Sequence, residues 1–444
     1  MSRLALLLLP LLLLAFPVPA APLVMQPALV IPLDGDGTLN ARGEVLPLDV
    51  DGDGVLEYAH WNGRRLLRVF RQDGTKLWER ANPAGYRHDR WTYIDHYAAW
   101  DIDGDGRDEL LHCWERDGSL WLQVSDGRDG RVKREARLPS PLWEACHVAL
   151  FFLERPGSAA GVPTLLVPLR AVDAGFQRLP GETDDVEYLS AVRAYDAGLS
   201  QLWQARTPEA GHWFHGVDAD GDGRVEAVFA GRHRLAADGG LTCTLEGWPA
   251  TDHVDSAQVA DILPARPGLE MAAVGASGAA LFDAGDCRRI WSLDAGRVPD
   301  PQHVVAGAFD PGSPGLELVI GRGGAGSGLP RIYDFVRADG TIVRSLEVEP
   351  LGITMHPLMN CRPDAIAPDK ICLGEGWVMD WAGTVLLRPD WYRPLQELDA
   401  AERSLHRFDQ WSPFAVTGDL LGDAREEMIV WGRHVLVVGR LAGG

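Results

Sequence analysis

Three short segments of the chain are near copies of one another, and this repetition constrains the fold more than any other feature. Each copy has Asp at its first, third and fifth positions, Gly at its fourth and sixth, and Glu at its ninth. The copies are residues 49–57, 101–109 and 218–226. Because a repeated motif indicates a repeated structural unit, the sequence predicts an array of similar units.

The spacing of the acidic residues predicts metal binding. Carboxylates at alternate positions around a glycine turn can surround Ca²⁺ with hard oxygen ligands. The motif resembles the first half of an EF-hand loop, but a glutamate arrives at position nine instead of position twelve. We therefore predict Ca²⁺ in at least one loop, with these candidate ligands: Asp49, Asp51, Asp53, Glu57, Asp101, Asp103, Asp105, Glu109, Asp218, Asp220, Asp222 and Glu226. The alternative is a plain hairpin turn, which suits residues 34–37 because no acidic residue follows them at the right distance.

Worn copies of the motif extend the array. Residues 260–270, 309–317 and 418–427 keep a turn and a closing Glu between apolar strands, whereas residues 150–166 and 359–373 have lost most carboxylates. Hairpin patterns such as residues 70–78 and 195–203 alternate with these marks, which gives about four short strands per unit. Four-stranded units are typical of propeller blades. The sequence predicts an all-β propeller of eight blades, with seven as the alternative, closed by a strand at residues 28–32.

Bulk properties indicate an exported protein. Arg3, an apolar run over residues 4–16 and the small residues near Ala21 are typical of a secretory signal peptide, so we expect residues 22–444 to form the mature propeller domain. No later segment is apolar for long enough to span a membrane. The net charge of −21 argues against a nucleic acid partner. We expect a secreted or periplasmic monomer.

Six cysteines fit an oxidising compartment. Six residues allow fifteen pairings, and the sequence cannot choose among them. We favour pairing between nearest neighbours, with Cys361–Cys372 first because it closes a short loop. No Cys-x-x-Cys motif is present, which argues against a zinc knuckle or a redox pair.

Histidines precede many of the repeat marks. They are His88, His96, His147, His212, His215, His253, His303, His356 and His406. Their placement upstream of inner strands predicts a polar cup at the channel mouth that takes an anionic ligand, since His carries protons near neutral pH. Two alternatives stay open: each His caps a strand, or the cluster holds a transition metal.

Part of the chain resembles a known enzyme family. The stretches that carry the resemblance are residues 215–226, 252–261, 266–270 and 307–317, preceded in the same order by residues 73–78 and 100–106. Together they resemble polysaccharide lyases of the rhamnogalacturonan lyase type, family 11. The Asp-Gly motifs alone are also similar to the FG-GAP and VCBS repeats of other propellers.

The resemblance implies a Ca²⁺-bearing propeller that cleaves an anionic, uronic acid-containing polysaccharide or oligosaccharide by β-elimination. That reaction needs a base, an acid and a cation that neutralises the substrate carboxylate. The candidates for base and acid are His96, His215, His253 and Tyr93, and Arg232 is the candidate carboxylate clamp. Substrate contacts are expected from His212, His303 and Arg90. The segment Leu111–Trp114 departs from the pattern expected of this family.

Two other functions compete with the lyase. A propeller without catalytic activity could bind a glycan or protein at the cell surface. A metal-dependent hydrolase could use the His cluster, and it would lose activity with a transition-metal chelator but keep it with Ca²⁺.

Overall fold

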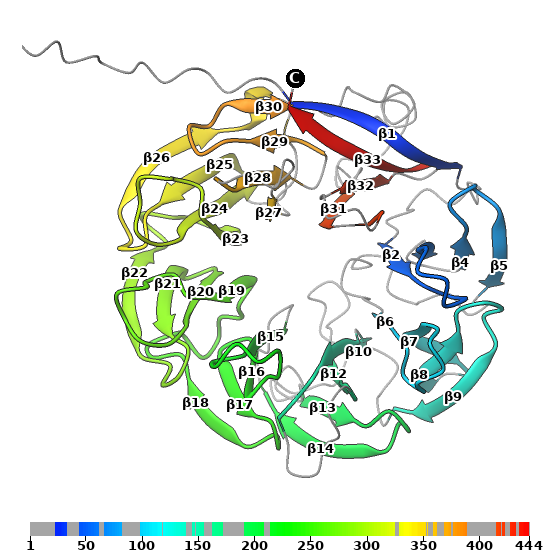
Figure 1. Cartoon of the computed structure of the whole chain (residues 1–444). Helices are drawn as coiled ribbons and strands as arrows, with labels where there is room; N and C mark the ends of the chain where they lie inside the picture. Colours follow the sequence, from blue (N-terminus) through cyan, green and yellow to red (C-terminus); the bar gives the residue numbers. More distant parts are fainter. Residues whose placement is uncertain are drawn as a thin grey trace, which may run out of the picture.

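Short apolar strands separated by glycine turns pair into eight antiparallel sheets, which form a ring in the computed structural model (Figure 1). Among the described residues the one named helix is the 3₁₀ turn η3, Glu349–Leu351. The predicted all-β propeller with eight blades is therefore confirmed. The structure describes residues 23–32, 44–61, 66–81, 98–117, 119–138, 144–146, 148–154, 162–171, 191–207, 214–324, 328–351, 353, 358–361, 368–373, 376–388, 414–418, 420–421, 427–431 and 435–443.

The blades follow one another in chain order. Blade one contains β2 Glu44–Leu48, β3 Glu57–Trp61, β4 Leu66–Phe70 and β5 Lys76–Ala81. Blade two contains β6 Ala98–Trp100, β7 Glu109–Arg116, β8 Ser119–Asp126 and β9 Val132–Arg137. Blade three contains β10 Glu144–Cys146, β11 Ala149–Phe151, β12 Thr164–Ala171, β13 Ala191–Tyr195 and β14 Gln201–Arg206. Blade four contains β15 Phe214–Val217, β16 Ala227–Ala230, β17 His233–Ala236 and β18 Leu241–Thr244. Blade five contains β19 Ser256–Ala260, β20 Glu270–Gly275, β21 Gly278–Asp283 and β22 Arg289–Asp294. Blade six contains β23 Pro301–Gly307, β24 Glu317–Gly324, β25 Leu329–Val336 and β26 Ile342–Glu347. Blades seven and eight contain β27 Leu358–Cys361, β28 Lys370–Leu373, β29 Val378–Met379 and β30 Val385–Leu387; and β31 Phe414–Gly418, β32 Glu427–Trp431, β33 Val435–Gly443 and β1 Leu23–Pro32.

Antiparallel pairing gives the ring two distinct faces. On one face lie the turns from the innermost to the second strand and from the third to the outermost strand, and we call it the loop face. On the other lie the turns from the second to the third strand and the links between blades, and we call it the connector face. The three acidic motifs follow innermost strands, so they all lie on the loop face.

The two ends of the described chain close the ring. β1 pairs antiparallel with β33, from Leu23 opposite Gly443 to Pro32 opposite Val435. The predicted closing strand is therefore confirmed, and it is longer than residues 28–32. The pairing covers what would otherwise be an exposed sheet edge.

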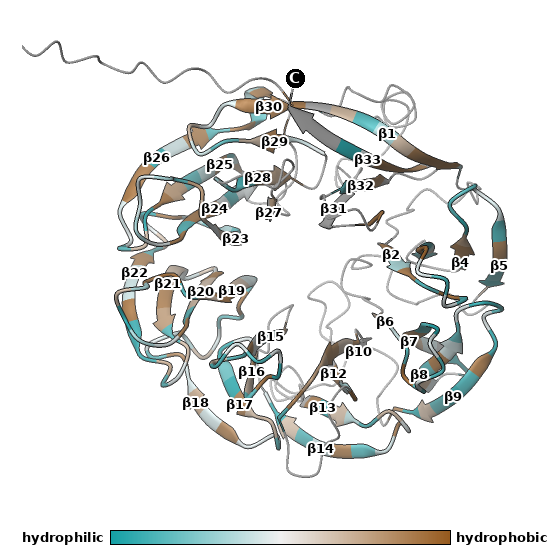
Figure 2. Ribbon diagram, in the orientation of Figure 1, coloured by the Kyte–Doolittle hydropathy of each residue, from teal (hydrophilic) through white to brown (hydrophobic). Residues whose placement is uncertain are grey.

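The apolar core lies between neighbouring blades. On β3, Tyr58 packs in the cluster shared with blade eight, whereas the adjacent Ala59 packs in the cluster shared with blade two. This follows from strand geometry, because successive side chains point to opposite faces of a sheet. All five residues of β3 are buried, whereas outermost strands such as β9 and β14 mix apolar and polar residues and are largely half-buried or exposed (Figure 2).

Backbone hydrogen bonds also join the loops of neighbouring blades. The N–H of Asp108 donates to the Asp49 carbonyl at 2.8 Å, and the Asp108 carboxylate accepts from the Asp49 N–H at 2.8 Å. The same pair of bonds joins Asp369 in blade seven to Ala308 in blade six. The loop face is thus a hydrogen-bonded belt as well as a set of turns.

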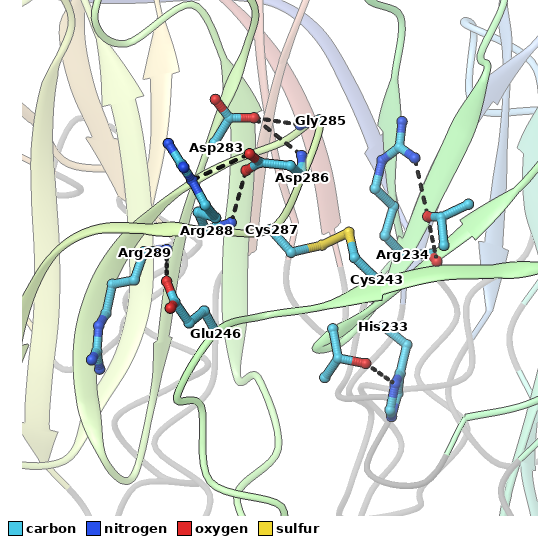
Figure 3. Close-up of a disulfide and its surroundings, with 12 residues drawn as sticks. His233, Arg234, Cys243, Glu246, Asp283, Gly285, Asp286, Cys287, Arg288 and Arg289 are labelled. Carbon is cyan, nitrogen blue, oxygen red and sulfur yellow. Dashed lines mark hydrogen bonds and ion pairs between the residues drawn. A yellow bond between two sulfur atoms is a disulfide. The ribbon is translucent and has the colours of Figure 1, made fainter.

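Two disulfides confirm the nearest-neighbour pairing where it can be tested. Cys361–Cys372 lies within blade seven, and Cys243–Cys287 joins β18 of blade four to the β21–β22 turn of blade five (Figure 3). Both have Cα atoms 6.0 Å apart, within the usual range. Cys113 is also disulfide-bonded. The side chain of Cys146, its predicted partner, lies outside the described residues.

Candidate functional site

The first Asp of each acidic loop shapes the turn. Asp49 accepts hydrogen bonds from the N–H groups of Gly52 (2.7 Å) and Gly54 (2.9 Å), and Asp101 and Asp218 do the same in their loops. Both glycines have φ near +80° in every copy, a conformation that costs Gly nothing. This explains why the sequence repeats Gly at the fourth and sixth positions.

The ninth residue closes the loop from the other side. Glu57 Oε2 accepts the N–H of Val50 at 3.1 Å, and Glu109 and Glu226 make the equivalent bond at 3.1 and 2.9 Å. The closing residues of the worn copies, Glu270, Glu317 and Glu427, also accept backbone N–H groups from their own loops. Loop closure by this Glu is therefore the shared feature of six blades.

Each acidic loop gathers three carboxylates whose oxygens lie within 4.8 Å of one another. The groups are Asp49 with Asp51 and Asp53, Asp101 with Asp103 and Glu109, and Asp218 with Asp220 and Glu226. Clustered carboxylate oxygens of this kind fit a hard divalent cation. Burial raises the pKa of Glu57, and the neighbouring carboxylates of Asp51, Asp53 and Asp49 raise it further. The first loop therefore concentrates negative charge around Glu57.

Blade two differs, because a lysine enters its acidic cluster. Lys133 Nζ lies 2.6 Å from Glu109 Oε1, 2.7 Å from Asp103 Oδ2 and 3.8 Å from Asp105 Oδ2. Its hydrogen bond holds the pKa of Asp103 below the usual range. Burial opposes the charge on Lys133, but the bonds to Asp103 and Glu109 prevail and raise its pKa. Lys133 was not among the sequence-predicted site residues, since nothing in the local sequence links residue 133 to residue 103.

On the connector face, the segment before β19 holds a histidine–carboxylate pair. His253 Nε2 lies 2.8 Å from Asp255 Oδ1, and the side chains are 27% and 11% exposed. Asp252 is buried and accepts the N–H groups of Ala276 (3.2 Å) and Ser277 (2.8 Å), which fixes the neighbouring hairpin turn. This segment combines a solvent-accessible imidazole with a rigid support.

The next polar residues of the same segment join two blades. Ser256 Oγ accepts the N–H of Val304 at 3.3 Å, and Gln258 Oε1 accepts the N–H of Ala306 at 2.7 Å. Both acceptor residues lie on the inner strand of blade five and both donors on that of blade six. Part of the motif that suggested the enzyme family therefore has a structural role.

The other described candidates lie at separate places. Arg232 is partly buried in the β16–β17 turn on the connector face, and its Nε has no hydrogen-bond partner among the described residues. His215 lies on β15, two residues before Val217, and so faces the cluster shared with blade five, where burial lowers its pKa to about 4. His303 lies on β23 opposite Gly321.

Several candidates cannot be placed. Arg90, Tyr93, His96 and His212 lie outside the described residues, as does the turn predicted at residues 34–37. Of the partners now visible, sequence reasoning missed Asp255 and Lys133. The motif Asp252–Ser256 contained Asp255, but only the structure shows that its carboxylate meets the imidazole.

Comparison with known proteins supports the fold. No protein-family model matches the sequence, and no curated protein matches it either. Among solved structures, rhamnogalacturonan lyase YesW is 19% identical with a TM-score of 0.63 over 93% of this chain and 75% of that one. The Bacillus licheniformis rhamnogalacturonan lyase PL11 is 17% identical with a TM-score of 0.63, over 92% and 74%.

A third structure of similar shape has a different description. The V. cholerae biofilm matrix protein Bap1 is 13% identical with a TM-score of 0.53, over 95% of this chain and 89% of that one. At these identities the likeness shows a shared propeller fold. None of the helices among the described residues is long and apolar enough to cross a membrane.

Proposed function

We propose that the chain is a polysaccharide lyase that cleaves a uronic acid-containing polysaccharide by β-elimination. The observation that carries the proposal is the His253–Asp255 pair on the connector face of a fold shared with rhamnogalacturonan lyases. A partly exposed imidazole held by a carboxylate has the orientation and the access to solvent that a general base requires.

The chemistry assigns His253 the role of base. It takes the proton from the carbon next to the uronate carboxylate, a carbon–carbon double bond forms, and the bond to the glycosidic oxygen breaks. Asp255 orients the ring and stabilises the imidazolium that results. The departing oxygen takes a proton from an acid, for which Tyr93 and His96 remain the candidates.

Arg232 suits the task of neutralising the substrate carboxylate. Its guanidinium is planar and permanently charged, and it matches a carboxylate with two parallel hydrogen bonds. The buried Nε has no hydrogen-bond partner among the described residues, so a bound carboxylate would satisfy a donor that otherwise costs free energy. His212, His303 and Arg90 are proposed to contact neighbouring sugars.

His215 fits the role of base less well than His253. Its position faces the interior between two blades, and its lowered pKa keeps it neutral at pH 7. Proton uptake there would put a charge in a desolvated site. We therefore assign His215 a supporting role.

Calcium in the acidic loops would act on stability. The loops lie on the loop face, and a five-residue inner strand such as β19 separates the two faces by roughly 15 Å. Asp49, Asp51, Asp53, Asp218, Asp220 and Glu226 would hold the ions. A cation there neutralises repulsion between carboxylates and fixes the belt of loops.

We also infer that the protein works outside the cytoplasm. The disulfides Cys243–Cys287 and Cys361–Cys372 favour an oxidising compartment. The export signal proposed at residues 1–21 agrees with this location but lies outside the described residues.

The test is the absorbance of unsaturated product against a panel of uronic acid polymers. His253→Ala should reduce turnover by about 10²–10⁴-fold without changing the melting temperature, the usual loss for a proton-transfer group. Asp255→Asn should give a smaller loss. His233→Gln is the matched control: His233 is buried beside Thr244, so its loss should lower stability and leave turnover per folded molecule unchanged.

A propeller that binds a glycan or protein without cleaving it is the second candidate. The similarity to the biofilm matrix protein Bap1 favours it, since that propeller matches over 95% of this chain. The binding protein would retain a polysaccharide on an affinity gel without forming unsaturated product. If wild-type protein gives no product with any uronic acid polymer, the lyase proposal is wrong.

A further inference from the structure

The blades differ in what lies beside the second carboxylate oxygen, Oε1, of the closing glutamate. Oε2 accepts backbone N–H groups in all six copies, which leaves Oε1 as a carboxylate oxygen in need of a positive partner. These side chains lie deep in their blades: Glu57, Glu109, Glu270, Glu317 and Glu427 are at most 4% exposed. A desolvated carboxylate needs a nearby cation or a full set of hydrogen bonds.

In three blades the chain itself supplies that cation. Lys133 Nζ lies 2.6 Å from Glu109 Oε1, Arg440 Nε 3.4 Å from Glu427 Oε1, and Arg266 Nε 3.8 Å from Glu270 Oε1. Lys133 lies on an outermost strand, Arg440 on the third strand of its blade and Arg266 in a loop. Their shared feature is thus the charge that they place beside the glutamate.

Blades one and four lack such a partner. Among the described residues, no ion pair within 4 Å involves Glu57 or Glu226. Arg71 Nη2 reaches only Asp51, at 3.8 Å on the exposed rim, and Arg234 influences Glu226 from a longer distance. These are also loops in which three carboxylates converge. In blade six, Glu317 Oε1 is buried without a hydrogen-bond partner among the described residues, but no Asp triplet surrounds it.

The strand register shows how Lys133 reaches its loop. In seven blades the outermost strand contains a bulge at its second residue, which the pairing with the third strand skips. In blade eight the skipped residue is Ala28, near the middle of β1. Lys133 is the skipped residue in blade two. The skipped residues in the other six are Leu77, Leu202, Thr242, Ile290, Val343 and Leu386. Blade two alone of these seven places a cation at this position.

We propose that Lys133 replaces the metal ion in blade two, so that, of the three described acidic loops, only those of blades one and four bind divalent cations. The ammonium group lies within 2.7 Å of oxygens of Asp103 and Glu109, which a Ca²⁺ ion would itself approach to about 2.3–2.6 Å. A metal ion could enter only by displacing Lys133. The inference rests on the proposed Ca²⁺ binding of the other two loops.

Calcium stoichiometry, measured by titration calorimetry and equilibrium dialysis, tests the proposal. Wild-type protein should bind two Ca²⁺ ions, and Lys133→Met should bind three. Thr242→Lys moves the cation to the equivalent position of blade four and should leave one site. The double variant should bind two ions again. A wild-type count of three, or an unchanged count of two in Lys133→Met, would overturn the proposal.

A second measurement separates this proposal from calcium binding itself. In chelator, Lys133→Met should lower the melting temperature by about 3 °C or more, because Asp103 and Glu109 lose their counter-ion. Leu77→Met, at the same bulge position of blade one, should change it little. If no variant binds Ca²⁺ but Lys133→Met is destabilised in chelator, calcium binding fails and Lys133 remains the internal cation. If Lys133→Met is as stable as wild type in chelator, the lysine does not act as a cation.

Discussion

The loop face and the connector face of the ring are built in different ways. On the loop face, six blades use a glutamate to close a turn, and neighbouring turns are joined by backbone hydrogen bonds. On the connector face, single side chains have individual partners, such as His253 with Asp255 and Asp252 with the β20–β21 turn. Repetition therefore belongs to the face that holds the ring together, and variation to the face where we propose chemistry.

The difference suggests a division of tasks. A repeated loop can be changed in one blade while five others still close, so changes there should alter stability in increments. A site built from single residues has no second copy, so one change there can remove activity. Experiments that affect one property and spare the other can test the division.

Calcium removal should have the largest effect on stability. Each loop that loses an ion from a solution 100-fold above its Kd should lower the free energy of unfolding by about 3 kcal/mol. Asp218→Ala should remove only the contribution that calcium in the blade-four loop makes to the free energy of unfolding. Denaturant unfolding with and without chelator measures this change. Turnover below the transition should stay constant, and loss of turnover from a folded, chelated protein would show that the loop face takes part in the reaction.

Asp252→Ala should show that the connector face also contains structural residues. The change leaves the N–H groups of Ala276 and Ser277 without their acceptor, which should cost about 1–3 kcal/mol of unfolding free energy. Urea unfolding at constant calcium measures the loss. An unchanged midpoint would mean that the turn holds its shape without Asp252, and the support proposed for His253 would be wrong.

The stability of the fold should also depend on pH through His112, which is buried on β7 and belongs to neither face. Burial lowers its pKa to about 3, and Ser125 and the Cys113 carbonyl are its partners. In the unfolded chain the His112 imidazole takes up a proton near pH 6.5. Above that pH it is neutral in both the folded and the unfolded chain, so its burial causes no loss of stability. Below it, stability should fall by about 1.4 kcal/mol per pH unit until the folded pKa is reached.

His112→Gln should remove this pH dependence. Unfolding free energies of wild type and variant, measured at pH 7 and pH 5, should converge as the pH falls. If the two proteins have parallel pH profiles, burial does not keep the His112 imidazole neutral in the wild-type protein.

Much of the fold could be predicted from the sequence because its turns are specified locally. The Asp–Gly motif contains the acceptor, the glycines with positive φ and the closing Glu within nine residues, so each copy marks the end of one strand and the start of the next. The closing strand was predicted from a count of strands in the last unit. The disulfides Cys361–Cys372 and Cys243–Cys287 followed from proximity along the chain.

The candidate site was harder to predict because its contacts join distant residues. Lys133 meets Glu109 through a bulge on a strand two positions further out, and the sequence around Lys133 does not show that a side chain at this bulge reaches the acidic loop. The histidines were grouped by their position before inner strands. The structure shows that they have different surroundings, because His253 meets the Asp255 carboxylate in a connecting segment, whereas His215 lies on a strand and faces the cluster shared by blades four and five.

Pairing of β1 with β33 also determines when the protein can be complete. These strands lie about 400 positions apart, so their contact forms against a large loop-closure entropy and should be a late event in folding. During synthesis β1 is made before β33 and lacks this pairing until β33 has been made. A chain that ends before β33 would have an open seam and an exposed apolar strand, which quality control can recognise. The β1–β33 pairing is therefore present only in chains that contain both strands.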